Sequence, residues 1–320
     1  MAMATRKSRS SNYQTLALNR FLVIFSFLGI PLGLYLVWVL WPTLYTFYLS
    51  LTNWDSFTPP VFAGLENYKN LIKDPEFLHA LKNNAIWIIV FITVPTAAGL
   101  SLATVLNNNL RFDRFLKVAY FLPMVIAPVI IALIWSWIYL PEQGLLNSFL
   151  SKVLEFLKFL GFNVNPKDAF HVGWLGDPNL ALVAVMAPAM WRQTGYVMIL
   201  YLAGLKTVDS EVVEAAKVDG ATGWTMFRYV IFPMLAPVTT IVVVVSIVDS
   251  LRSFDIVNVM TKGGPVSSTE VLANYMYVKS FDDNRLGYGA AIAVVLFGIA
   301  LIFVMLYLRQ VMAQEDEGTA

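Results

Sequence analysis

The sequence predicts an all-α integral membrane protein with six transmembrane helices, and two observations lead to this fold class. Of the 320 residues, 58% are hydrophobic and only 13% are charged, whereas soluble domains carry about 25% charged residues. The mean hydropathy is +0.65. The hydrophobic residues are also gathered into stretches of about 20 or more, which is the length an α-helix needs to cross a bilayer core of about 30 Å.

Six stretches of the chain are long enough to be such spans. The first, at 21–50, follows several basic residues and could be mistaken for a signal peptide. It is longer than the apolar region of about 7–15 residues in a signal peptide, and no small-residue cleavage site follows it. We therefore expect it to remain as a membrane anchor. The other five stretches lie at 84–106, 118–140, 180–204, 234–259 and 286–309.

Six spans place both ends of the chain on the same side of the membrane. The short connection between the second and third spans contains Arg111, Arg114 and Lys117, and short loops rich in Lys and Arg stay in the cytoplasm. Both termini are therefore expected to be cytoplasmic in a multi-pass protein. The chain divides into a cytoplasmic N-terminal segment at 1–20, a six-helix transmembrane domain at 21–310 and a cytoplasmic tail at 311–320.

The composition excludes several classes of function. The 22 Lys and Arg residues nearly balance the 21 Asp and Glu residues, so no basic field points to nucleic acid as a partner. The chain has no Cys and only two His, which leaves little material for a metal site. It also lacks a Gly-x4-Gly-Lys-Ser/Thr phosphate-binding loop. We expect no cofactor and no metal in this chain, and membrane lipid around it.

The two long outer loops are predicted to contain short helices. Residues 51–83 include an amphipathic stretch from Leu65 to Leu81, and residues 141–179 include apolar and basic positions in alternation from Leu145 to Phe162. Such stretches, with aromatic residues beside them, are typical of helices that lie at the membrane surface.

The inner segment at 205–233 is far longer than a connection between two helices requires, and long loops in compact proteins are usually functional. Asp209 or Ser210 can cap the start of a helix, and Gly220 can end it. A second short helix follows before Pro233. The first helix has a shallow face of small residues, which suits a groove on another protein. The alternative is a helix that lies on lipid.

The spacing of this segment resembles a known motif. Glu214-Ala215-Ala216 is followed after three residues by Gly220, and nine residues later by Val230-Ile231-Phe232-Pro233. This resembles the EAA loop of ATP-binding-cassette (ABC) importer permeases, Glu-Ala-Ala-x3-Gly-x9-Ile-x-Leu-Pro, with Val and Phe as apolar replacements for Ile and Leu. Further resemblance to the maltose and glycerol-phosphate type of permease comes from Asp219, Asn67-Tyr68, Gly263-Gly264-Pro265 and Thr269.

The resemblance implies a permease subunit in a bacterial or archaeal cytoplasmic membrane, not an enzyme. It would form, with a second homologous permease, the path of an ATP-driven importer for a carbohydrate: a sugar, an oligosaccharide or a polyol. Two cytoplasmic ATPase subunits would bind ATP and Mg, and an external solute-binding protein would deliver the substrate. In the family the loop docks on the ATPase, and that coupling role carries over to Glu214, Ala215, Ala216, Asp219, Gly220 and Pro233.

The fifth span carries a polar face. Ionisable groups within a membrane cost roughly 2.5–3.5 kcal/mol each and rarely face lipid. One interpretation is the wall of a translocation cavity that offers hydroxyls and a carboxylate to a polyhydroxy solute, which the family resemblance supports. The other is that Arg252 pairs with Asp249 or Asp255, with hydrogen bonds to neighbouring spans. The residues at helical spacing i, i+3, i+4, i+7 are Ser246, Asp249, Ser250 and Ser253.

The fourth and third spans add further candidates for the substrate site. A sugar site combines an aromatic face with a few placed polar groups, and Trp191, Arg192, Gln193 and Tyr196 can supply both. The alternative is that the aromatics pack against helices and that Arg192 pairs with an aspartate. Met124 lies between two prolines, which bend the third span and can make space for substrate; the alternative for Met124 is packing filler.

Two other classes of function remain as alternatives. A secondary transporter driven by an ion gradient would show inverted repeats and a relay of membrane-embedded ionisable groups, and no repeat is detectable. An intramembrane enzyme would need a catalytic set at bilayer depth, and no His pair, Cys or Ser/His/Asp set lies there.

A phosphorylated solute would favour Arg192 or Arg252 as its partner. Each has an acidic candidate nearby, which favours a neutral sugar.

Overall fold

The protein is almost entirely helical in the computed structural model, as the sequence predicts. The structure describes residues 25, 27–108, 111–167 and 172–318, so the N-terminal segment at 1–20 lies outside the described residues. The helical elements are η1 (Leu36–Leu40), α2 (Trp41–Ser50), α3 (Glu66–Lys73), α4 (Pro75–Leu106), α5 (Asp113–Val125), α6 (Pro128–Ile138), α7 (Leu145–Phe159), α8 (Ala181–Leu205), α9 (Ser210–Val218), α10 (Gly223–Met226), η3 (Phe227–Ile231), α11 (Phe232–Met234), α12 (Ala236–Leu251), α13 (Phe254–Met260), α14 (Leu272–Tyr277), η4 (Val278–Asp282) and α15 (Leu286–Gly318). In the described part of the chain, the only strands are the antiparallel pair β1 (Thr52–Asn53) and β2 (Val61–Phe62).

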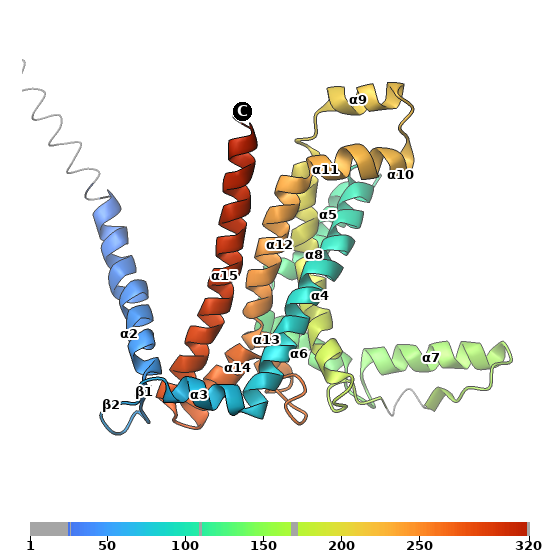
Figure 1. The fold of residues 1–320 in the computed structure, drawn as a ribbon. Helices are drawn as coiled ribbons and strands as arrows, with labels where there is room; N and C mark the ends of the chain where they lie inside the picture. Colours follow the sequence, from blue (N-terminus) through green and yellow to red (C-terminus); the bar gives the residue numbers. More distant parts are fainter. Residues whose placement is uncertain (1–24, 26, 109–110, 168–171, 319–320) are drawn as a thin grey trace, which may run out of the picture.

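The long helices run back and forth between two ends of the molecule (Figure 1). The start of the first described span, Phe27–Ser50, and the end of α15 lie at the end that carries α9, while α3, α7 and α14 lie at the opposite end. This arrangement agrees with a chain that crosses the membrane an even number of times. We call the two ends the α9 end and the α7 end. Helix α15 continues to Gly318, so most of the residues assigned to a separate tail extend the last helix.

Among the residues that the structure describes, three single helices are long and apolar enough to cross a membrane, at Phe27–Ser50, Pro75–Leu106 and Leu286–Arg309, and two bent helix pairs raise the number to five. The predicted fourth span corresponds to α8, which has 25 residues. Its polar centre, Arg192-Gln193-Thr194, leaves it less apolar than those five.

Two of the six predicted spans are broken rather than continuous, and one starts earlier than predicted. α5 and α6 meet at 101°, because Pro128 is the first residue of α6 and the residue before a proline leaves the helical region. α12 ends at Leu251, and α13 begins at Phe254. α4 starts at Pro75 rather than at residue 84, because the Asp74 side chain accepts hydrogen bonds from the backbone N–H groups of Glu76 and Phe77 and caps the helix.

Helix α8 is the most buried of the long helices and forms the centre of the bundle. Two buried hydrophobic clusters lie along it, one around Trp87 and Met186 and one around Tyr201 and Leu235. A third cluster joins α3 and the start of α4 to α14 and α15.

Close approach of α5 to α8 depends on Gly195. A Cβ atom at this position would overlap the carbonyl oxygen of Tyr120 and would lie 3.2 Å from the Cα atom of Phe121. Because backbone atoms cannot rotate out of the way, only glycine allows the two helices to pack this closely.

A cluster of hydrogen bonds joins three helices at the α7 end. Asp74 accepts hydrogen bonds from the hydroxyls of Tyr275 on α14 (2.5 Å) and Tyr288 on α15 (2.6 Å). Partial burial opposes ionisation of Asp74, but these hydrogen bonds and those from backbone N–H groups outweigh it, so the pKa of Asp74 lies below its ordinary value. The ionised carboxylate thus ties the start of α4 to α14 and α15.

The loop that carries Gly263-Gly264-Pro265 is held in one conformation by α4. The Asn83 side chain donates hydrogen bonds to the carbonyl oxygens of Ser268 (3.0 Å) and Glu270 (2.8 Å). The Thr269 hydroxyl donates to the Gly264 carbonyl at 2.8 Å. Burial raises the pKa of Glu270 above its usual range, although hydrogen bonds from Asn274 and the Val271 N–H oppose the shift. These residues of the predicted motif therefore have a structural role.

Both long loops at the α7 end contain the predicted short helices, α3 and α7. Helix α7 exposes apolar residues such as Phe149 and Phe156, while its buried Asn147 binds the loops on both sides of the helix. Asn147 donates hydrogen bonds to the carbonyls of Pro141 and Val172 and accepts one from Trp174 at 2.7 Å. The position of these helices at a membrane surface stays a prediction.

Candidate functional site

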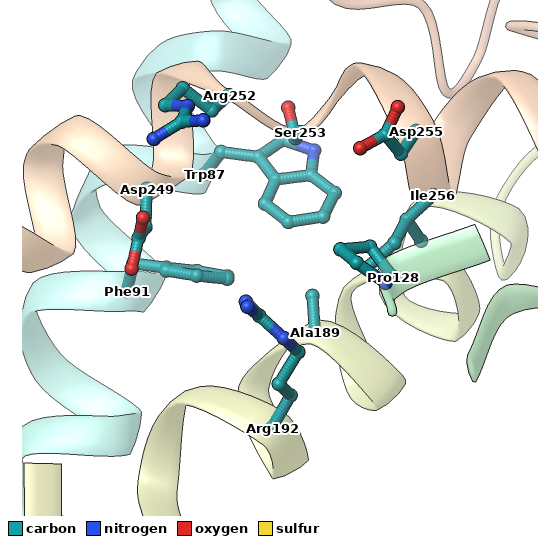
Figure 2. A pocket seen from close by; sticks show the side chains of 10 residues that line it. All are labelled: Trp87, Phe91, Pro128, Ala189, Arg192, Asp249, Arg252, Ser253, Asp255 and Ile256. Carbon is teal, nitrogen blue, oxygen red and sulfur yellow. The ribbon is translucent and has the colours of Figure 1, made fainter. Parts of the chain in front are cut away.

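A polar cavity of about 140 Å³ lies between the long helices, and we call it the central pocket. Residues from α4, α6, α8, α12 and α13 surround it, so it depends on the packing of segments far apart in the sequence. Figure 2 shows its lining: Trp87, Phe91, Pro128, Ala189, Arg192, Asp249, Arg252, Ser253, Asp255 and Ile256.

Four charged side chains line the central pocket. Arg192 projects from α8, while Asp249, Arg252 and Asp255 come from the region where α12 gives way to α13 (Figure 2). Among the described residues, none of these four forms an ion pair within 4.0 Å. Direct ion pairs of Arg192 and Arg252 are therefore not observed, although Asp249 interacts electrostatically with both arginines. The formal charges of the two arginines and the two aspartates sum to zero.

The break between α12 and α13 brings three of these charges to the pocket. Arg252 follows the last residue of α12, and Ser253 precedes the first residue of α13. The predicted continuous helical face of Ser246, Asp249, Ser250 and Ser253 is wrong at Ser253, because α12 ends at Leu251. Asp249 and Ser253 line the pocket, whereas Ser246 and Ser250, which lie in α12 with Asp249, do not.

Several buried polar atoms at the pocket lack a partner among the described residues. The indole Nε1 of Trp87, the Nε of Arg192 and the Oγ of Ser253 form no hydrogen bond there. Trp87 and Ser253 are at least nine-tenths buried, with 0% and 6% of their surface exposed. Buried polar groups in proteins are nearly always hydrogen-bonded, so these atoms mark a place for water or a polar ligand.

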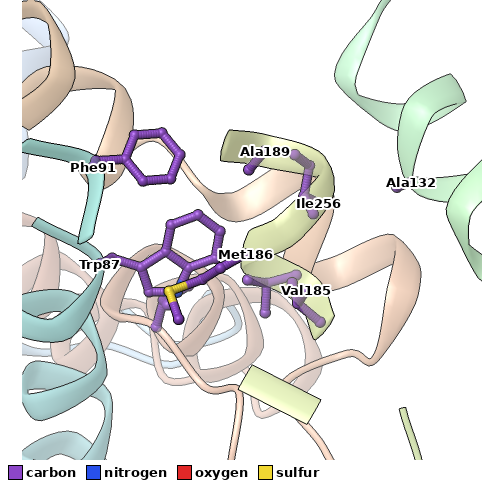
Figure 3. Close-up of a cluster of buried hydrophobic side chains, with 9 residues drawn as sticks. Trp87, Phe91, Ala132, Val185, Met186, Ala189 and Ile256 are labelled. Atoms are coloured by element: carbon purple, nitrogen blue, oxygen red, sulfur yellow. The ribbon is translucent and has the colours of Figure 1, made fainter. Parts of the chain in front are cut away.

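A hydrophobic cluster supports the aromatic side of the pocket (Figure 3). The rings of Trp87 and Phe91, one helical turn apart on α4, have centroids 5.3 Å apart. Both pack in the cluster that includes Met186 and Val185 of α8 and Ile256 of α13. Trp87 is thus fixed by its neighbours while one part of it faces the pocket, which makes it a rigid aromatic surface.

The structure brings together only part of the predicted set of substrate residues. Arg192, Asp249 and Ser253 line the central pocket. Gln193 is 1% exposed, and its amide makes no hydrogen bond of standard geometry with a described residue, although it interacts with Asp249. Ser250 donates to the carbonyl of Ile247 in its own helix.

The remaining candidates lie outside the pocket lining. Trp191 is 44% exposed, and its ring contacts that of Trp135 with centroids 6.0 Å apart. Met124 and Tyr196 are half-buried. Trp87 and Phe91 on the second span are pocket residues that the sequence did not predict. Their spacing of four residues shows that they share a face, but not that this face meets a cavity.

The segment at 205–233 forms a second candidate site, built around α9. The Asp209 side chain accepts a hydrogen bond from the Glu211 N–H at 2.8 Å and caps the helix, as predicted. Gly220 has φ +87°, a conformation that favours glycine. No residue of α9 is buried.

The residues of the expected coupling motif lie on or near this exposed helix. Glu214, Ala215, Asp219, Gly220 and Pro233 are exposed, and Ala216 is half-buried. A groove of about 250 Å³ separates α9 from the ends of the long helices, lined among others by Leu205, Val213, Glu214 and Lys217. In α10 and η3, Trp224 contacts Phe227 with ring centroids 5.5 Å apart, and Trp224 is 73% exposed. The segment presents a free surface at the α9 end.

Metal ligands do not gather anywhere in the described ranges: no three His, Cys, Asp or Glu side chains there are close enough to hold an ion.

Comparison with known proteins agrees with this arrangement. Residues 95–315 match the family described as "Binding-protein-dependent transport system inner membrane component". The chain is 37% identical to a probable ABC transporter permease protein of Pyrococcus horikoshii, over 85% of this chain and 89% of that protein. It is 31% identical to the trehalose/maltose transport system permease protein of Thermococcus litoralis, over 86% of this chain and 88% of that one.

A solved structure has the same fold. A chain of a bacterial ABC transporter involved in the import of the acidic polysaccharide alginate superposes with a TM-score of 0.75 at 19% identity, covering 93% of this chain and 98% of that chain. The family match spans more than half of the sequence and includes α8, α9 and α12. The chain therefore belongs to the family of inner membrane components of binding-protein-dependent transport systems, whose members are non-catalytic permease subunits that work with a separate ATPase.

Proposed function

We propose that this permease carries a carbohydrate through the central pocket and is driven by two ATPase subunits that dock on α9. The observation that carries the proposal is the pocket itself. An aromatic surface, two guanidinium groups, two carboxylates and a hydroxyl line one cavity, and its charged groups form no ion pair within 4.0 Å with a described residue. Aromatic rings contact the apolar faces of sugars, and such polar groups can hydrogen-bond their hydroxyls.

The chemistry of the pocket favours a neutral polyhydroxylated solute. The formal charges of the pocket sum to zero, because two arginines and two aspartates line it. An anionic solute would have to compete with Asp249 and Asp255 for the guanidinium groups. The named relatives in Thermococcus litoralis and in Haloferax volcanii, described for trehalose/maltose and for xylose/arabinose, support a sugar.

Coupling to ATP hydrolysis is proposed to pass through α9 and its flanking glycines. The helix is exposed along its length and joins α8 to α12, both of which contribute charged residues to the pocket. A push on α9 would therefore reach both walls of the pocket. In this proposal the α9 end is cytoplasmic, a second permease completes the path, and a solute-binding protein docks at the α7 end. The ion-gradient alternative has no support from the family.

Charge reversal at Glu214 tests the coupling site. We expect Glu214→Lys to abolish co-purification of the ATPase subunit and ATP-dependent uptake in membrane vesicles. Glu142→Lys is the control for ATPase co-purification, because Glu142 is also exposed but lies in the loop before α7, away from α9. Normal ATPase binding and uptake by Glu214→Lys would disprove the docking proposal.

A pair of serine variants tests the pocket. Ser253 lines the cavity with an unpartnered hydroxyl, whereas Ser250 is buried three residues away and bonds within its own helix. Loss of a hydrogen bond to substrate costs about 0.5–1.5 kcal/mol, so Ser253→Ala should raise the KM for uptake of the transported sugar about 2–12-fold. Ser250→Ala should leave KM unchanged; equal effects of the two would contradict the assignment.

A further inference from the structure

A second groove lies between α5 and α8, nearer to the α9 end, and it is distinct from the central pocket. Its volume is about 260 Å³, and its lining combines apolar side chains with two lysines, Lys117 of α5 and Lys206 immediately after α8. The other lining residues are Ile199, Leu202 and Ala203. We call it the inner groove.

One face of α8 connects the central pocket to the inner groove. Arg192, Tyr196, Ile199, Ala203 and Lys206 are spaced by four, three, four and three residues, so they lie along one side of the helix. The first lines the central pocket, and the last three line the inner groove. Tyr196 and Ile199 are half-buried, while Ala203 and Lys206 are exposed. Accessibility therefore rises toward the α9 end.

The facing helix α5 also has a face that leads from the inner groove toward the central pocket. Lys117, Phe121 and Met124 share one face, and Pro128 at the start of α6 lines the central pocket. Phe121 and Met124 are half-buried. Because the backbone of α5 contacts α8 at Gly195, the two faces stay side by side along the length between the pocket and the groove.

The inner groove carries excess positive charge. Lys117 is paired with Asp113 at 2.8 Å, whereas Lys206 forms no ion pair within the described part of the chain. Arg114 adds another exposed cation on the same helix as Lys117. A groove with charge of one sign raises the local concentration of the opposite ion and lowers that of like ions.

We propose that the inner groove is the cytoplasmic mouth of the translocation path, and that Lys206 and Lys117 make it admit neutral and anionic solutes while repelling cations. This inference rests on the proposed function, because it extends the path from the central pocket to the α9 end. The alternative is a groove covered by lipid, in which the lysines bind anionic headgroups. It would have the same lining residues, so the experiment must distinguish it from a water-filled mouth.

Cysteine labelling separates the two, because the chain contains no cysteine. Ala203→Cys and, one turn deeper, Ile199→Cys are introduced into the complete transporter in inside-out vesicles. Each is treated with an anionic (sulfonatoethyl) or a cationic (trimethylammonioethyl) methanethiosulfonate. In each reaction the thiolate forms a mixed disulfide and methanesulfinate leaves. Charged reagents react only where water reaches.

Ala203→Cys should react with both reagents and faster with the anionic one. One unit charge at about 8 Å in water changes the concentration of a monovalent ion about 2.4-fold, in opposite directions for the two signs, so Lys206→Gln should lower the anionic-to-cationic rate ratio about sixfold. Leu122→Cys is the control. Leu122 is 55% exposed on the other side of α5 from Lys117 and should be covered by lipid.

Absence of reaction at both Ala203→Cys and Ile199→Cys, as at Leu122→Cys, would show a lipid-covered groove and overturn the proposal. Reaction with equal rates for the two reagents, unchanged by Lys206→Gln, would overturn the role of the lysines. The labelling reports water access and local charge without ATP. Failure here is therefore distinct from failure of the Glu214→Lys test, which reports the ATPase contact.

Discussion

Replacement of Gly195 by alanine tests the packing on which both the central pocket and the inner groove depend. The added Cβ atom would overlap the Tyr120 carbonyl oxygen and would lie 2.9 Å from its carbonyl carbon. Since these are backbone atoms, α5 must shift as a whole. Overpacking a tight contact costs about 1–3 kcal/mol, and a backbone obstacle argues for the upper part of that range. Alanine favours a helix over glycine by about 1 kcal/mol, which leaves a net loss of folding stability of about 2 kcal/mol.

The assay is thermal unfolding of the purified protein, followed by the intrinsic fluorescence of its nine tryptophans. For a chain of 320 residues, a loss of about 2 kcal/mol corresponds to a fall in Tm of about 3 °C. Gly298→Ala in α15 is the matched control, because no atom lies within 4 Å of its added Cβ; its Tm should be unchanged or higher. A Gly195→Ala protein as stable as Gly298→Ala would refute the close packing of α5 on α8.

Three further predictions concern single polar side chains. The depressed pKa of Asp74 means that its contribution is present above the unfolded pKa of 3.8 and is lost as the pH falls through the folded value. Asp74→Asn should therefore cost about 1–3 kcal/mol at pH 7, and its Tm difference from the parent protein should shrink below pH 4. Asn147→Ala should speed amide hydrogen exchange in the loop at 172–175, because two carbonyls and an indole N–H lose their partner. Asp209→Ala should destabilise α9 by about 1 kcal/mol, because the helix loses its cap. Amide hydrogen exchange at residues 211–213 should become faster, while the Tm of the protein stays nearly unchanged.

Features set by local chemistry could be predicted from the sequence. The all-α fold follows from the length and spacing of apolar stretches, the start of α9 from Asp209, and the bend of the third span from its prolines. Gly220 was predicted to end the helix and has the positive φ that such an end requires. Asp74-Pro75 also carried a helix-start signal, but counting only apolar residues placed the span nine residues too late.

Features set by tertiary packing could not be predicted in this way. Nothing in the residues around Arg252 breaks a helix by itself, since neither proline nor glycine is present there. The helix break and the gathering of four charges at one cavity are properties of several helices together. Trp87 and Phe91 lie in an apolar span where every face looks alike in sequence, so their place at the pocket depends on which side of α4 meets α8 and α13.

The interruption between α12 and α13 has a consequence for how substrate preference can change. A helix end leaves main-chain carbonyl groups without intrahelical partners and carries partial negative charge, whereas a helix start offers free amide groups and partial positive charge. Both kinds of terminus meet beside the cavity. Mutation of side chains leaves these main-chain dipoles in place. Exchange of Asp249, Arg252 or Ser253 would therefore change which solute is preferred, while the polar environment that lets such a solute enter the membrane would remain.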